Sequence, residues 1–110
     1  MAALKRAGYN AVRTAHHAPS SAFLAAADAL GLLVLYEFFD VWDVAKNSHD
    51  GHVGFGDSWR RDVTALMERD RSRPCIVMWS VGNEVADRAG AYFKQPRRVR
   101  VRVAEWVQQK

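Results

Sequence analysis

Three short apolar runs divide the chain, and each is followed directly by polar or ionisable residues. The runs lie near residues 10–14, 32–37 and 75–81. The third contains no polar residue from Cys75 to Trp79, which is typical of a parallel strand that is buried on both faces. We therefore predict three parallel strands, adjacent in chain order, with the third buried on both faces.

Helical patterns separate the predicted strands. Apolar residues between Ser20 and Gly31 recur at helical spacing, with Ser20 in a position to start the helix and Gly31 to end it. Residues 1–7 have the pattern of the last turns of an earlier helix, which Gly8 closes. The first two strands are therefore each expected to follow a helix.

A further helix is predicted to begin at Asp57 or Ser58 and to end before Pro74. Charged residues lie on one face of this helix, and the opposite face is apolar, consisting of Trp59, Val63, Leu66 and Met67. This division is typical of a helix that packs on one side and is solvated on the other. The repeated order of helix and strand predicts an α/β fold.

Ionisable or amide side chains stand at the end of each predicted strand. The carboxyl ends of parallel strands meet at one rim of the sheet, where α/β enzymes hold ligands and catalytic groups. We therefore expect one site that contains Arg13, His16, Glu37, Asp40, Asn83 and Glu84. Glu84, directly after the most apolar run, is the candidate acid or base.

The length of 110 residues limits how much of such a fold is present. A complete (β/α)8 barrel needs about 250 residues. Three parallel strands leave both sheet edges unpaired and leave part of each apolar helix face uncovered. We therefore expect the chain to be a piece of a larger fold.

Composition excludes several classes of function. No stretch is apolar enough for a membrane span, and the first residues show no secretion signal, which slightly favours a cytoplasmic location. Net charge is +4, and the basic run from Lys94 to Arg102 lacks interleaved aromatic residues, so no nucleic-acid partner is expected. The pair His49 and His52 lies in a Gly-rich loop without a Cys partner. We expect loop histidines there, with no metal and no cofactor.

The motifs together resemble the catalytic TIM barrel of glycoside hydrolase family 2, and most closely its β-galactosidase-like members. The resemblance covers residues 1–90 in order and rests on Asn10-Ala11-Val12-Arg13-Thr14-Ala15-His16, on Glu37 through Trp42, on Arg69-Asp70-Arg71-Ser72-Arg73-Pro74, and on Trp79-Ser80-Val81-Gly82-Asn83-Glu84. It implies a partial (β/α)8 barrel in which the three runs are strands 2 to 4. Residues 91–110 depart from the family pattern as a divergent helical tail.

The resemblance also implies roles for individual residues. Glu84 corresponds to the general acid/base of the family, and Asn83 to the residue that hydrogen-bonds the 2-hydroxyl of the sugar. Arg13 corresponds to an arginine beneath the catalytic carboxylates, and His16 to a histidine that contacts sugar. Asp40 and Trp42 correspond to the loop that lines the sugar pocket, and Glu37 to a residue that organises the site.

These roles imply a retaining β-glycosidase that acts on a β-glycoside or oligosaccharide. Such an enzyme needs an acid and, about 5 Å away, a nucleophilic carboxylate. Burial beside Trp79 would help Glu84 to hold its proton. The resemblance places the nucleophile on the seventh strand, with the other strands and accessory domains absent from this sequence. The alternative is a catalytically inactive truncated product, or an interaction module derived from the barrel.

Overall fold

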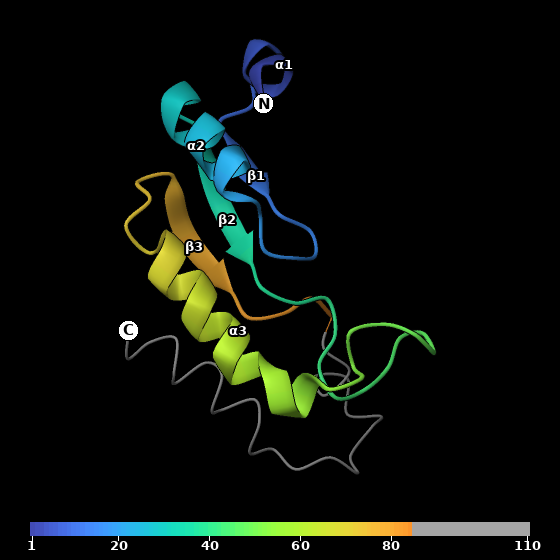
Figure 1. The fold of residues 1–110 in the computed structure, drawn as a ribbon. Coiled ribbons are helices and arrows are strands. Elements are labelled where there is room, and N and C mark those ends of the chain that lie inside the picture. The colour runs from blue at the N-terminus through green and yellow to red at the C-terminus, as the bar shows by residue number, and fades with distance from the viewer. Residues whose placement is uncertain (85–110) are drawn as a thin grey trace.

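The computed structural model describes residues 1–84 of the chain (Figure 1). The predicted helical tail, residues 91–110, lies outside these described residues. Helices and strands alternate along the chain as predicted. They are α1 (Ala2–Arg6), β1 (Ala11–Arg13), α2 (Ser21–Leu30), β2 (Leu33–Glu37), α3 (Phe55–Asp70) and β3 (Ile76–Ser80).

The three strands form one parallel sheet in the order β1-β2-β3. Arg13 pairs with Leu35 across β1 and β2, and Glu37 pairs with Ser80 across β2 and β3. The carboxyl ends of all three strands therefore lie at the same rim (Figure 1). The predicted order and direction of the strands are confirmed.

Alternate residues of β2 face opposite sides of the sheet. Val34 and Tyr36 are fully buried, and they belong to the main core together with residues of both long helices, Leu24, Ala27, Val63 and Met67. Leu35 and Glu37 belong to the opposite face, where they line a pocket. Because α2 and α3 cover the same face, the other face remains available for a site.

The ends of α2 follow the predicted signals. The Ser20 side chain accepts a hydrogen bond from the Phe23 amide at 3.2 Å, which satisfies one free donor of the first turn. Gly31 ends the helix in the left-handed conformation, with φ of 62°, a geometry that glycine adopts without a Cβ clash. Short helix α1 is likewise followed by Gly8, with φ of 88°.

The start of α3 differs from the prediction of Asp57 or Ser58. The helix begins at Phe55, after Gly54 in the left-handed conformation with φ of 80°. The reason is packing, because the Phe55 ring is buried against Trp42 and is held inside the first turn. Asp57 lies in that first turn, where its charge complements the positive end of the helix dipole.

The prediction that the third strand is buried on both faces is wrong for the described residues. Val77 and Met78 of β3 are 58% and 57% exposed. β3 is the outermost strand of the described sheet, so within residues 1–84 nothing pairs with its free edge. The open sheet edge agrees with the expectation of an incomplete barrel. Within these residues no helix is both long and apolar enough to cross a membrane.

Candidate active site

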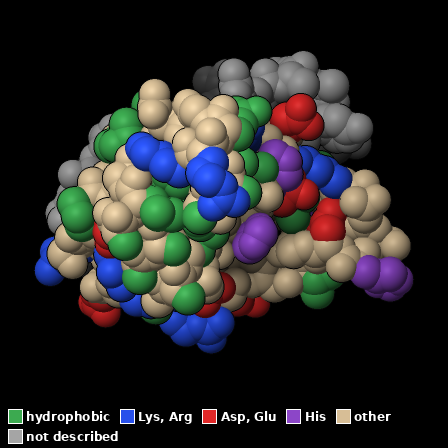
Figure 2. Space-filling model, turned by 90° about the horizontal axis from the view of Figure 1, so that it is seen from above, with side chains coloured by type: hydrophobic (Ala, Val, Ile, Leu, Met, Phe, Trp, Pro, Cys, Tyr) green, Lys and Arg blue, Asp and Glu red, His purple; other side chains and the backbone are tan. Residues whose placement is uncertain are grey.

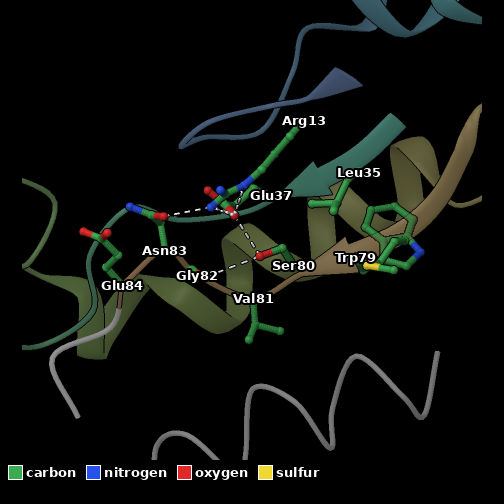
Figure 3. Close-up of a pocket in the computed structure, with 10 residues that line it drawn as sticks. Arg13, Leu35, Glu37, Trp79, Ser80, Val81, Gly82, Asn83 and Glu84 are labelled. Carbon is green, nitrogen blue, oxygen red and sulfur yellow. Dashed lines mark hydrogen bonds and ion pairs between the residues drawn. The ribbon is translucent and has the colours of Figure 1, made fainter. Parts of the chain in front are cut away.

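A pocket of about 590 Å³ opens at the rim where the three strands end (Figure 3). Its lining comes from the ends of β1, β2 and β3 and from the residues that follow β3. The lining residues are Arg13, Leu35, Glu37, Met78, Trp79, Ser80, Val81, Gly82, Asn83 and Glu84. Four of the six polar residues predicted for one site, Arg13, Glu37, Asn83 and Glu84, therefore share this pocket.

Glu37 is the centre of the polar network, although it is fully buried. Arg13 donates to Glu37 Oε2 from Nε at 3.0 Å and from Nη2 at 2.7 Å. Ser80 Oγ donates to the same oxygen at 2.9 Å, and His16 Nδ1 lies 2.7 Å from Oε1. The Glu37 amide donates to Thr14 Oγ1 at 2.9 Å. Both carboxylate oxygens are thus held by partners from neighbouring strand ends.

This environment decides the charge of Glu37. Burial alone would raise the pKa of the carboxyl group, because it penalises the charged form. Hydrogen bonds from His16, Arg13 and Ser80 favour the charged form and together hold the pKa below its ordinary value. Arg13 therefore stabilises the charged form of Glu37.

Two residues of the network also reach the surface. The Arg13 and His16 side chains are 46% and 39% exposed, while Glu37 beneath them is closed off. Acidic, basic and histidine side chains lie close together on one part of the face shown in Figure 2. A ligand at this rim would meet the outer faces of Arg13 and His16 before it met Glu37.

Asn83 is held in one orientation by partners on two sides. Its Oδ1 accepts a hydrogen bond from Arg13 Nη2 at 2.7 Å, and its Nδ2 donates to Asp40 Oδ1 at 3.1 Å. Its backbone amide donates to the Phe39 carbonyl at 3.0 Å. The amide group therefore joins the first strand end to the segment that follows β2.

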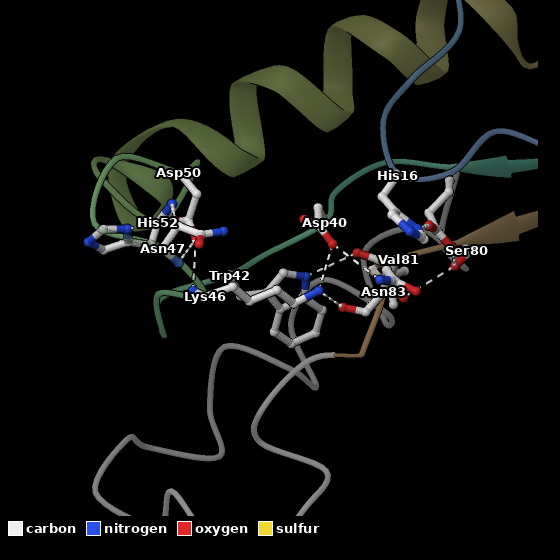
Figure 4. A network of polar contacts seen from close by, with 12 residues as sticks. His16, Asp40, Trp42, Lys46, Asn47, Asp50, His52, Ser80, Val81 and Asn83 are labelled. Carbon is white, nitrogen blue, oxygen red and sulfur yellow. Dashed lines mark hydrogen bonds and ion pairs between the residues drawn. The ribbon is translucent and has the colours of Figure 1, made fainter.

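Asp40 lies beside this pocket and is paired with a lysine that sequence reasoning missed (Figure 4). Lys46 Nζ donates to Asp40 Oδ1 at 2.6 Å and to the Asn83 carbonyl at 3.0 Å. The hydrogen bond from Lys46 is the largest cause that holds the pKa of Asp40 below its ordinary value, and the bond from Asn83 adds to it. Asp40 is therefore a charged acceptor.

Glu84 lines the pocket next to Asn83, on the side away from Arg13 (Figure 3). It differs from the expectation in one respect, because it is exposed rather than buried beside Trp79. Trp79 instead packs on the core face of the sheet against Tyr36 and Phe38. The Glu84 backbone is left-handed, with φ of 41°, which is uncommon for a residue with a side chain and is found at functional sites.

Trp42 is placed differently from the sugar-lining position that the resemblance implies. The ring is only 5% exposed and stacks on Phe55, with ring centroids 6.0 Å apart. Its indole N–H donates to the Val81 carbonyl at 3.0 Å. Trp42 therefore supports the segment after β2 and offers no open ring face to a ligand.

Three contacting residues were missed by the sequence reasoning: Thr14, Lys46 and Ser80. Ser80 could have been found from strand spacing. It lies two residues after Met78, so the two side chains face the same side of β3, and Ser80 pairs with Glu37 across the sheet. Thr14 directly follows Arg13 and could also have been considered. Lys46 carries no such signal, because its contact depends on the path of a loop.

The two loop histidines predicted not to bind metal are His49 and His52. His52 Nδ1 lies 2.7 Å from Asp50 Oδ1, so its ring is engaged within the loop. The residues from 1 to 84 contain no group of three or more His, Cys, Asp or Glu side chains that could hold a metal ion.

Proteins similar to this chain are glycoside hydrolases. Residues 1–100 match the TIM barrel domain of glycosyl hydrolases family 2. The β-galactosidase of Bacteroides ovatus is 38% identical over 84 residues, which cover 76% of this chain and 10% of that protein. A β-galactosidase of Arthrobacter sp. is 36% identical over 89 residues, covering 76% and 9%.

Solved structures give the same result. A β-glycosidase from Bacteroides vulgatus matches with a TM-score of 0.85 and 35% identity, over 96% of this chain and 13% of that one. A family 2 glycosyl hydrolase from Bacteroides cellulosilyticus matches with a TM-score of 0.75 and 42% identity, over 80% and 11%. The chain spans about a tenth of the length of the relatives it matches. It belongs to glycosyl hydrolase family 2, and its three parallel strands are part of the TIM barrel of that family.

Proposed function

We propose that this chain forms part of the active site of a retaining, β-galactosidase-like glycosidase, with Glu84 as the general acid/base. One observation carries the proposal. Arg13, Glu37 and Asn83 come from three different strand ends and are joined by direct hydrogen bonds. Glu84 follows Asn83 and lines the same pocket. A preorganised polar group of this kind at the carboxyl rim of barrel strands is where such enzymes carry out their chemistry.

In this proposal Glu84 protonates the leaving oxygen of a β-galactoside and later activates water. Its exposed position suits contact with a ligand. Asn83 and Asp40 provide fixed hydrogen-bonding groups for sugar hydroxyls, and His16 provides a further contact at the rim.

Glu37 is a positioning residue and not the nucleophile. Its side chain is fully buried, and its oxygens are occupied by Arg13, Ser80 and His16. A carboxylate in that state cannot reach an anomeric carbon. The burial of Glu37 also favours a second hypothesis for the isolated chain. In this hypothesis the chain is an inactive product, because the nucleophile has to come from a segment outside it.

A chimera tests the role of Glu84. The segment of the B. ovatus β-galactosidase that aligns with this chain is replaced by the present sequence, and Glu84→Gln is introduced. We expect lactose turnover to fall by about 100-fold or more, because general acid catalysis contributes on this order. Nitrophenyl galactoside needs less proton assistance, so its first step should suffer less, and azide should restore turnover by trapping the glycosyl-enzyme.

The matched control is Glu68→Gln, the same change at an exposed position of α3. This variant should keep the activity of the parent chimera with both substrates. Equal losses for lactose and nitrophenyl galactoside in Glu84→Gln, with no azide product, would remove Glu84 from the acid/base role.

A further inference from the structure

Three hydrogen bonds to backbone carbonyls tie the segment that follows β2 to the segment that follows β3. The Asn83 amide donates to the Phe39 carbonyl at 3.0 Å, and the Trp42 indole donates to the Val81 carbonyl at 3.0 Å. Lys46 Nζ donates to the Asn83 carbonyl at 3.0 Å. Of the three, the bond from Lys46 is the one nearest Glu84 along the chain, and the one that a charged group makes.

Lys46 holds Asn83 in two ways. It contacts the Asn83 carbonyl directly, and it contacts Asp40 Oδ1, the oxygen that also accepts from Asn83 Nδ2. An ammonium group has three donors and no acceptor, so it can serve both oxygens at once. The Lys46 side chain is 28% exposed, and its charge is therefore only partly available to water.

The backbone of Lys46 is itself fixed by a carboxylate. Asp50 Oδ2 accepts from the Lys46 and Asn47 amides, each at 2.7 Å, and Asp50 Oδ1 accepts from the His52 amide at 3.0 Å (Figure 4). Side-chain burial of Asp50 raises its pKa, but these bonds and the His52 ring outweigh it and keep the pKa well below the ordinary value. The loop therefore presents Lys46 from a fixed position.

These contacts converge on the peptide group between Asn83 and Glu84. The carbonyl that Lys46 binds belongs to this peptide group, and Glu84 follows it with the left-handed φ of 41°. We propose that Lys46 is a positioning residue, which fixes the Asn83–Glu84 peptide group and thereby the direction in which the Glu84 side chain leaves the backbone. The catalytic meaning of this role rests on the proposed function of Glu84, but the positioning itself does not.

The first experiment uses the full 110-residue chain and NMR, so it needs no activity. Lys46→Met keeps much of the length of the side chain and removes every donor. We expect the Asn83 carbonyl ¹³C signal to move upfield and the Glu84 amide signal to shift, because a hydrogen bond to that carbonyl is lost. The pKa of Asp40 should rise, since its main partner is gone. Lys46→Arg keeps a charged donor, so each of these changes should be smaller than in Lys46→Met.

Lys5→Met is the matched control, because Lys5 Nζ also donates to a backbone carbonyl, that of Gly31, at 3.1 Å. It should leave the Asn83, Glu84 and Asp40 signals unchanged. Asp50→Asn, which weakens the support of Lys46, should reproduce the Lys46→Met shifts in reduced size. Unchanged Asn83 and Glu84 signals in a folded Lys46→Met chain would overturn the proposal.

Loss of the dispersed signals of core residues such as Tyr36 would show that Lys46→Met does not fold. In that case Lys46→Gln and Asp50→Asn are used for the same measurement. A second arm uses the chimera described above, where misplacement of Glu84 should lower kcat by about tenfold or more while KM changes little. Shifted NMR signals with normal kcat would confirm the positioning but remove its catalytic meaning. A change in KM alone would assign Lys46 to substrate binding and contradict the proposal.

Discussion

At the scale of single residues, Glu37 shows how a charged side chain is stabilised in a buried position. A buried carboxylate is unfavourable unless it is paired and hydrogen-bonded. Here it accepts from Arg13 and Ser80 and meets His16, and no side-chain polar atom buried within the described residues lacks a partner. Removal of the Glu37 carboxylate would therefore leave Arg13, Ser80 and His16 without this shared partner.

The lowered pKa of Glu37 makes stability depend on pH. A carboxyl group with a lower pKa in the folded state stabilises the protein above its unfolded value, 4.5, and loses this effect as pH falls through the folded pKa. We expect Glu37→Gln to lower the free energy of unfolding at pH 7 by about 2 kcal/mol, a value reduced for the solvent exposure of Arg13. The difference from the parent chain should shrink below pH 4.5.

Urea unfolding at pH 7 and at acid pH measures this effect. Asp62→Asn is the control, because its ion pair with Arg61 lies at the surface, with side chains 37% and 79% exposed. That variant should change stability by less than about 0.5 kcal/mol. A constant difference between Glu37→Gln and the parent chain at every pH would contradict the assigned charge.

Part of this residue arrangement was predictable from the sequence. Arg13, Glu37 and Asn83 were placed together because parallel strands bring their carboxyl ends to one rim. The burial of Trp42 and the position of Lys46 were not predicted, since both depend on the path of a long loop after β2. Periodicity describes strands and helices, and it contains no information about where such a loop returns.

At the scale of elements, α2 has both of its ends defined by single residues. Ser20→Ala removes the acceptor of the Phe23 amide and should lower the free energy of unfolding by about 1 kcal/mol. Gly31→Ala places a Cβ on a left-handed residue and should lower it by about 1 kcal/mol as well. Urea unfolding at pH 7 measures both changes.

Gly56→Ala is the control for the glycine change, because Gly56 lies within α3 and its added Cβ would meet the nearest atom, Asp43 Oδ1, at an ordinary 3.7 Å. It should be neutral or slightly stabilising, since alanine favours a helix more than glycine does. If both glycine variants lose stability equally, the left-handed conformation of Gly31 is not the cause.

Element boundaries were predictable where one local residue determines them. Ser20 and Gly31 mark α2 because capping is a contact within a few residues of the chain. The start of α3 at Phe55 depends on Trp42, a partner in another segment, and local signals pointed to Asp57 instead. The exposure of β3 likewise depends on whether another strand lies beside it, which its own apolar residues do not reveal.

At the scale of the whole molecule, the pocket formed by residues 1–84 is lined by two carboxylates, Glu37 and Glu84. Glu84 is exposed at the pocket, whereas Glu37 is closed off. Retaining glycosidases require a second reactive carboxylate about 5 Å away. We therefore expect the purified 110-residue chain to show no turnover of nitrophenyl β-galactoside.

Release of nitrophenol, followed over hours and compared with buffer alone, measures this. Glu105→Gln is the informative variant, because Glu105 is the last acid of the sequence. Turnover by the parent chain that disappears in Glu105→Gln would show that the chain supplies its own second carboxylate.

The distances along the sequence between site partners have a consequence for synthesis. Arg13 and Glu37 are 24 residues apart, whereas Arg13 and Asn83 are 70 apart. Joining the more distant pair costs about 1 kcal/mol more in chain entropy. On the ribosome, the Arg13–Glu37 pair can form while Asn83 has yet to be translated. The buried carboxylate therefore gains its counter-charge first, and Asn83 docks onto a guanidinium that is already held in place.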